Sequence, residues 1–250
     1  LDSSGNAGSA MAAYLAGAGM TASIFVPESA SAGKRRQIAA YGAQLVEIQG
    51  DRGEVTSAAQ AHADATGAVY ASHLWSPYFI AGMRTLGAEL ADLGPLDAVI
   101  FPTGSGSLVL GAFQGIEAVS ASDGYRGPRI YGVQVDACRP LVDAYETGAD
   151  ALVGSPVGNG TSIAEGILVA RPPRARAVLE AVRASGGAMI AVSEEEVERA
   201  LTSLWHQGIY AEPTSAAAEA GRIELLRRGL VGRNERIIVG LTGTALKTQR

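Results

Sequence analysis

Three glycine-rich segments are the most informative residues of this chain, and the first two have the features of an anion-binding loop. They are Ser3-Ser4-Gly5-Asn6-Ala7-Gly8, Gly104-Ser105-Gly106-Ser107 and Thr242-Gly243-Thr244-Ala245-Leu246-Lys247. Glycine permits positive φ and a close approach of the backbone to a ligand. Helical patterns follow the first two segments, and the N–H groups at a helix start favour negative charge. A plain tight turn explains either segment alone, but two with the same flanks predict anion binding.

Strand-like and helix-like patterns alternate along the chain, and glycine follows several of the helical ones as a C-cap. Strands are expected at residues 21–26, 44–48, 68–71, 97–102, 129–135, 188–192 and 236–241, and helices at 9–18, 31–41, 51–66, 79–93, 174–184 and 212–228. Ser193 is typical of an N-cap, and three glutamates follow it. This alternation predicts βαβ units on parallel sheets.

The alternation of strand-like and helix-like patterns is interrupted at residues 72–77, where we expect the chain to pass between two domains. The predicted fold is α/β, with two domains whose parallel or mostly parallel sheets are flanked by helices. The smaller domain covers residues 1–75 and the larger one residues 76–250. Leu1-Asp2 is typical of the end of a strand, so we expect that sequence precedes it in the natural protein.

A nucleotide-binding alternative rests on the second glycine segment. The segment resembles a dinucleotide-binding fingerprint, with a strand at 97–102, then Gly104 and Gly106, and later Asp136. Gly111 comes later than the third glycine of that fingerprint, and Asp136 lies further away than the expected ~20 residues. This alternative also leaves the first and third segments unexplained.

Composition excludes several other classes of function. The net charge is −5 and the isoelectric point is about 5.3, which argues against nucleic acid or an anionic membrane as a partner. Apolar runs stay well short of the ~20 residues of a membrane span. Cys138 is the single cysteine, which favours a cytoplasmic protein without disulfides. His, Cys and carboxylate spacings predict no metal site.

The ordered set of segments resembles the fold-type II pyridoxal 5'-phosphate (PLP) enzymes, the tryptophan synthase β family. Residues 3–8 are similar to that family's asparagine loop, which implies that Asn6 contacts the cofactor's ring hydroxyl. The same resemblance implies that the substrate carboxylate is bound by Ser3, Ser4, Gly5, Asn6 and Ala7.

Other segments resemble the family's remaining cofactor contacts. Residues 104–107 are similar to its phosphate loop, which implies phosphate binding by Gly104, Ser105, Gly106 and Ser107. Thr242 resembles the hydroxyl residue that faces the pyridine nitrogen. Gly166 and Glu212 lie in segments similar to those near the family's cofactor.

Within that family the chain is most similar to the threonine synthases. The likeness lies in residues 72–79 and 82–85, but Ala81-Gly82 stands where a Glu-Gly pair is expected. The resemblance implies a PLP-dependent carbon–oxygen lyase that converts O-phosphohomoserine to threonine and phosphate, with a small amino acid as substrate and a homodimer as the assembly. The alternatives are a threonine or serine dehydratase or ammonia-lyase, and a non-catalytic protein that binds PLP or an amino acid.

The lysine that would form the Schiff base is not recognisable in the chain. Lys34 and Lys247 are the only lysines, and neither matches its position in the resemblance. The family carries that lysine before the asparagine loop, so we expect it upstream of Leu1. We therefore identify no catalytic residue within these 250 residues.

Overall fold

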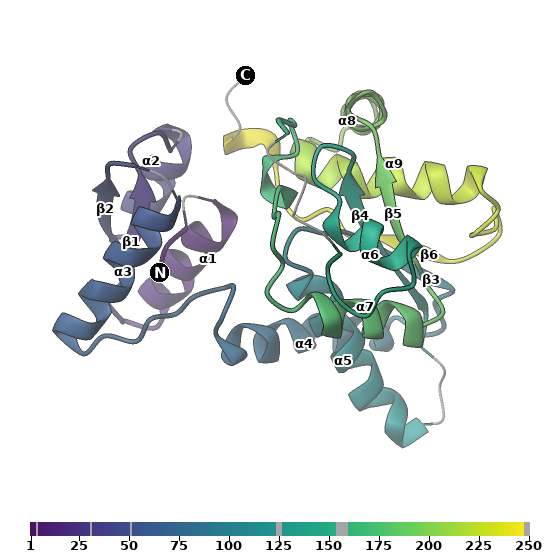
Figure 1. Ribbon diagram of the computed structural model, residues 1–250, viewed down its shortest axis with the longest axis horizontal. Helices are drawn as coiled ribbons and strands as arrows, with labels where there is room; N and C mark the ends of the chain where they lie inside the picture. Colours follow the sequence, from purple (N-terminus) through teal and green to yellow (C-terminus); the bar gives the residue numbers. More distant parts are fainter. Residues whose placement is uncertain (4, 31, 51, 124–126, 154–159, 248–250) are drawn as a thin grey trace. The chain divides into compact units, whose positions relative to one another are not determined.

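The structure, a computed structural model, describes residues 1–250 except 4, 31, 51, 124–126, 154–159 and 248–250. The chain divides into two compact units. The first contains Leu1–Ser76 together with Leu246, and the second contains Pro77–Ala245. In both units, helices alternate with parallel strands (Figure 1).

The first unit is built around the parallel pair β1 and β2, in which Phe25 lies opposite Val46. Its elements are α1 (Asn6–Gly17), β1 (Ser23–Pro27), α2 (Ala32–Ala40), β2 (Gln44–Ile48) and α3 (Arg52–Thr66). Asp2 forms a parallel bridge with Phe25. The prediction that Leu1-Asp2 behaves as the end of a strand is therefore confirmed.

Side chains of β1 alternate between its two faces, and the first unit has a small apolar cluster on each face. Ile24 and Val26 are fully buried on one face, where they pack with Ile38 of α2. Phe25 points to the opposite face and packs against Val55 of α3. Successive strand residues point to opposite faces, so one short strand serves both clusters.

The expected strand at residues 68–71 does not form. These residues are extended but pair with no strand of the described chain. Side chains hold the segment instead, because the Tyr70 hydroxyl donates to Asp2 at 2.7 Å while Val69 is 85% exposed. The apolar residues of this segment therefore do not form a buried strand.

The second unit contains a parallel sheet in the order β5-β4-β3-β6. Its strands are β3 (Ala98–Pro102), β4 (Arg129–Val135), β5 (Met189–Val192) and β6 (Ile237–Val239). Every residue of β3 is buried, as expected for a central strand covered on both faces. The last strand of the chain, β6, pairs with β3 rather than with β5.

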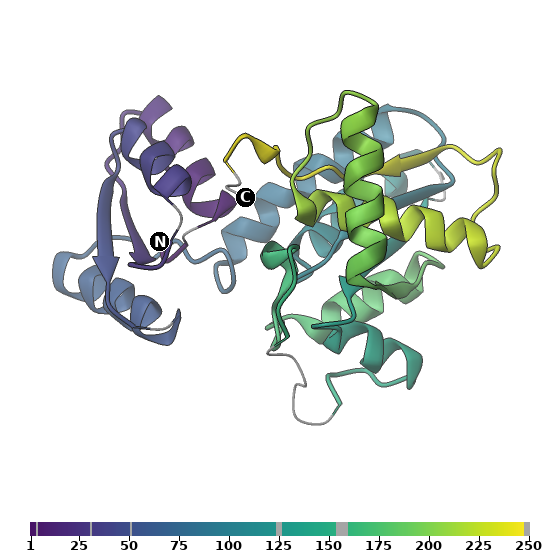
Figure 2. The same cartoon turned by 90° about the horizontal axis from the view of Figure 1, so that it is seen from above.

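Helices cover both faces of this sheet. Ile100 and Val133 face the cluster formed with α8 (Glu194–His206) and α9 (Pro213–Arg227), two helices that cross over the sheet (Figure 2). Val99 and Phe101 face the other cluster. The helices on that face are α4 (Pro77–Asp92), α5 (Ser107–Asp123), α6 (Pro140–Glu146) and α7 (Ala175–Ala184).

Most expected helices occur with shifted ends, and one short helix was not expected. The Ser193 N-cap is confirmed, since its hydroxyl accepts from the Glu196 N–H at 3.2 Å and the Glu196 carboxylate accepts from the Ser193 N–H at 2.8 Å. Helix α6 was missed because seven residues give little periodicity. Two 3₁₀ turns, η1 (Glu165–Ile167) and η2 (Ala245–Lys247), complete the described elements.

Candidate functional site

The loop between β3 and α5 begins at the carboxyl edge of the sheet, between β4 and β6. Its first residue, Thr103, is 1% exposed, and its N–H donates to the Val133 carbonyl at 2.7 Å. Gly106 has a φ of +78°, and a Cβ there would overlap the Val178 side chain. Conformation and space therefore both require glycine at Gly106.

This loop presents backbone donors without acceptors. The N–H groups of Gly104, Ser105 and Gly106 donate no hydrogen bond within the described part of the chain. Gly104 and Gly106 are buried and Ser105 is half-buried. Buried N–H groups nearly always have a partner, so this loop is suited to an acceptor from outside the chain.

Two hydroxyls and a helix start add to the loop's affinity for an anion. The Oγ atoms of Ser105 and Ser107 lie 3.0 Å apart, and Ser107 is the first residue of α5. A phosphate group offers several acceptor oxygens and is favoured by the helix dipole. The residues therefore fit the phosphate of PLP, and the four predicted residues form one continuous loop.

The segment around η1 forms a wall beside this loop. A Cβ on Gly104 would lie 3.1 Å from the Ile167 Cα and 3.2 Å from the Gly166 carbonyl oxygen. The Gly166 N–H donates to the Thr214 hydroxyl at 3.2 Å, at the start of α9. Gly166 therefore links the glycine loop to α9, as its predicted place near the cofactor requires.

The Thr242 segment is fixed by α9. Ser215 is fully buried, its Oγ accepts from the Gly243 N–H at 2.9 Å, and it lies 3.4 Å from the Thr242 hydroxyl oxygen. The N–H of Glu212 donates to the Gly243 carbonyl at 3.0 Å. Thr242 itself is exposed.

These contacts bring together every cofactor residue predicted in the second unit. The contacts run from Gly104 to Gly166, from Gly166 to α9, and from α9 to Thr242. The pairing of β6 with β3 explains this, because it places the loops that follow the two strands side by side at one edge.

The predicted loop of the first unit has a different character. Ser3 is buried, and its Oγ accepts from the Gly5 N–H at 3.3 Å. Asn6 and Ala7 begin α1, whose N-cap Gly5 provides no side-chain cap. Gly8 packs directly on the Ser3 carbonyl, where a Cβ would overlap it. Ser4 lies outside the described residues.

Sequence reasoning missed three residues that support the site. Ser215 lies in the same segment as Glu212 but was not predicted as a site residue. Glu194 was assigned only to a helix-terminal charge set, yet it accepts from the Ser162 hydroxyl at 2.6 Å and the Ile163 N–H at 2.7 Å. Gln134 is a fully buried amide in β4. A polar residue inside an apolar strand was the available signal for Gln134.

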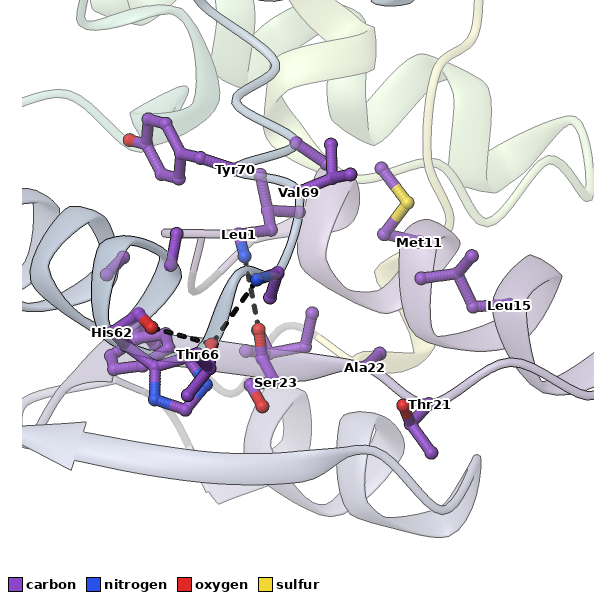
Figure 3. Close-up of a pocket in the computed structure, with 16 residues that line it drawn as sticks. Leu1, Met11, Leu15, Thr21, Ala22, Ser23, His62, Thr66, Val69 and Tyr70 are labelled. Atoms are coloured by element: carbon purple, nitrogen blue, oxygen red, sulfur yellow. Dashed lines mark hydrogen bonds between the residues drawn. The ribbon is translucent and has the colours of Figure 1, made fainter.

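A cavity of about 280 Å³ lies within the first unit (Figure 3). It is lined mainly by apolar side chains such as Met11, Leu15 and Val69. The Leu1 nitrogen there donates to the Ser23 carbonyl at 3.1 Å. The cavity includes none of the predicted site residues.

Comparison with known proteins decides the family. The family model described as "Pyridoxal-phosphate dependent enzyme" matches residues 1–243. The chain belongs to this family. The predicted resemblance and the cofactor, PLP, are therefore confirmed at the level of the family.

Curated relatives of this PLP-family chain are threonine synthases. That of Methanocaldococcus jannaschii is 31% identical over 253 residues, covering 98% of this chain and 61% of the relative. That of Bacillus sp. is also 31% identical, over 249 residues, covering 98% and 68%. The chain thus spans about three fifths of the length of the first of these.

Solved structures confirm the predicted fold class. Maize serine racemase aligns with a TM-score of 0.80 at 22% identity, covering 99% of this chain and 73% of that one. The threonine deaminase of T.th. aligns with a TM-score of 0.79 at 25% identity, covering 100% and 77%. The chain therefore shares the fold of these two enzymes.

Among the residues that the structure describes, no group of His, Cys, Asp and Glu has an arrangement that could bind a metal ion. None of the described helices is long and apolar enough to cross a membrane.

Proposed function

We propose that the full protein is a threonine synthase-like lyase that converts O-phosphohomoserine and water to threonine and phosphate. The observation that carries this proposal is the glycine loop with its buried, unpaired N–H groups, in a chain similar to threonine synthases over 98% of its length. In the reaction the carbon–oxygen bond to phosphate breaks and water adds at Cβ, so all atoms balance.

The second unit contributes the cofactor contacts in this proposal. Gly104, Ser105, Gly106 and Ser107 bind the PLP phosphate through backbone N–H groups and hydroxyls. Thr242, positioned by Ser215, faces the pyridine nitrogen. A neutral hydroxyl there does not keep the ring protonated, which suits elimination and replacement. When bound, PLP withdraws electrons from the substrate's Cα bonds.

The first unit contributes the substrate contacts. Ser3, Ser4, Gly5, Asn6 and Ala7 bind the substrate carboxylate, and Asn6 also contacts the ring hydroxyl. The helix start at Asn6 supports this assignment, because its amides favour a negative group. The assembly proposed for the full protein is a homodimer, which analytical ultracentrifugation tests.

The reaction is tested by substrate turnover of the full protein with PLP. With O-phosphohomoserine we expect phosphate release matched by threonine. Keto-acid formation from threonine, without phosphate release from O-phosphohomoserine, contradicts the proposal. That outcome supports the second candidate, a dehydratase, which Ala81-Gly82 and the likeness to threonine deaminase favour.

The lysine assignment is a separate proposal. We expect borohydride reduction of the full protein with PLP, followed by peptide mapping, to label a lysine N-terminal to Leu1. A label on Lys34 or Lys247 contradicts this assignment. Absence of any label, with such a lysine present, supports the non-catalytic binding protein instead.

A further inference from the structure

Gln134 is a buried polar residue that the function proposed above does not use. Its side chain is 0% exposed in the middle of the sheet, on β4. Its Nε2 donates to the Thr103 carbonyl at 3.2 Å. Its Oε1 accepts from the N–H groups of Leu141 at 2.9 Å and Val142 at 3.2 Å. The amide therefore has partners on two separate segments.

The orientation of this amide is fixed by its neighbours. Leu141 and Val142 offer only N–H donors, so the oxygen must face them, and the Thr103 carbonyl requires the NH₂ group. Helix α6 receives no side-chain cap from its own N-cap residue, Arg139. Gln134, a residue of β4, caps α6 instead. The hydrogen bonds from α6 polarise the Gln134 side-chain amide, whose NH₂ group donates to Thr103.

The bond to Thr103 sets the direction of the next backbone donor. In a trans peptide, the carbonyl of one residue and the N–H of the next point in opposite directions. Thr103 and Gly104 share such a peptide, since the described chain has no cis bond. Because Gln134 holds the Thr103 carbonyl on one side, the Gly104 N–H faces the other side.

We propose that Gln134 is a positioning residue that aims the Gly104 N–H at the cofactor phosphate. This inference rests on the proposed function, in which residues 104–107 bind that phosphate. Gln134 does not touch the ligand. It fixes the first peptide of the loop, just as the Val178 side chain constrains Gly106, where an added Cβ would overlap it.

The test compares two ligands that differ only in the phosphate group. PLP and pyridoxal are titrated into the full protein and its variants. The ratio of the two affinities measures how strongly the loop binds the phosphate group. Gln134→Met removes all three hydrogen bonds. Gln134→Glu, measured at alkaline pH, keeps an acceptor for α6 but loses the donor to Thr103. We expect each variant to reduce the PLP-to-pyridoxal ratio about 10-fold or more.

Ser185→Ala is the matched control. The Ser185 hydroxyl accepts from the Ile130 N–H at 3.0 Å, at the opposite end of the same strand. Its loss also removes a side-chain bond to β4, but far from the loop. We expect this variant to lower stability and leave the affinity ratio unchanged, because a merely structural defect weakens both ligands alike.

Gly106→Ala separates failure of this inference from failure of the proposed function. If Gly106→Ala lowers the ratio and Gln134→Glu does not, the positioning role is wrong and Gln134 only caps α6. If Gly106→Ala leaves the ratio unchanged, residues 104–107 do not bind the phosphate, and both proposals fail. A reduced ratio in Gly106→Ala and both Gln134 variants supports both proposals.

Discussion

The two glycine loops share a sequence signature but are held in different ways. The loop after β3 is fixed by contacts from β4, η1 and α7, all distant in sequence. The loop before α1 is held partly from within, since the Gly5 N–H donates to Ser3 and Gly8 packs on the Ser3 carbonyl. Its base is held by the Ser3 N–H, which donates to the Phe25 carbonyl at 3.1 Å, and by the Thr56 hydroxyl, which donates to Asp2 at 2.7 Å.

The difference follows from the sheets beneath the loops. A central strand buried on both faces gives the second loop a rigid base on a broad core. The first loop stands beside a two-stranded sheet with two small clusters. We infer that the loop proposed to bind the phosphate is preorganised, whereas the loop proposed to bind the substrate carboxylate adjusts when a ligand binds.

The largest expected effect is that of Gly106→Ala on cofactor binding. The added Cβ meets Val178 at a φ of +78°, so the loop must shift. PLP affinity, measured by titration of the full protein, should fall by about 100-fold, or about 2.7 kcal/mol. Gly82→Ala is the control, since its Cβ meets nothing within 4 Å. Similar losses in both variants contradict the preorganised loop.

A medium effect is expected from a pair of buried serines, one in each unit. Ser215→Ala leaves the Gly243 N–H without its acceptor and should lower the unfolding free energy by about 1–3 kcal/mol. The Ser9 hydroxyl is buried with no partner in the described chain, so Ser9→Ala should be neutral or stabilising. Urea unfolding measures both. An equal loss in the two variants contradicts the contrast between the units.

The smallest effect concerns the far end of α9. Arg227 and Arg228 each donate to Glu224 at 2.6 Å, and these bonds lower the pKa of that carboxyl to about 2. The ionised form therefore stabilises the fold above the ordinary pKa of about 4.5, and this contribution falls as the pH drops toward 2.

Glu224→Gln should accordingly lower the unfolding free energy by about 1–2 kcal/mol at neutral pH. The difference from the natural protein should shrink between pH 4.5 and 2, and PLP affinity should stay unchanged. Denaturant unfolding at several pH values in this range measures the difference in unfolding free energy. A difference independent of pH means that packing, not charge, is lost.

Sequence reasoning predicted most of the fold because the strands of the second unit are long apolar runs. It failed at residues 68–71, where Val69 and Tyr70 look like strand residues but Tyr70 serves Asp2 through its hydroxyl. Helix α6 was missed because its seven residues give little periodicity, and because its cap, Gln134, is supplied from β4 rather than from its own N-terminus.

The candidate site was predictable where chemistry is local in sequence. Glycines 104 and 106 show their role directly, through backbone freedom. Ser215 and Glu194 do not, because their partners, Gly243 and Ser162, lie 28 and 32 residues away. The order of the strands in the sheet, which brings Thr242 beside the glycine loop, also depends on long-range pairing.

The pairing of β6 with β3 also affects how the protein is made. Arg236 accepts from the Asp97 N–H and donates to its carboxylate, so contacts that fix the central strand span 139 residues. During synthesis, β3 leaves the ribosome long before β6. One edge of β3 therefore stays open until β6 is made, and an open strand edge favours aggregation. A chaperone that shields this edge would raise the yield of the folded enzyme.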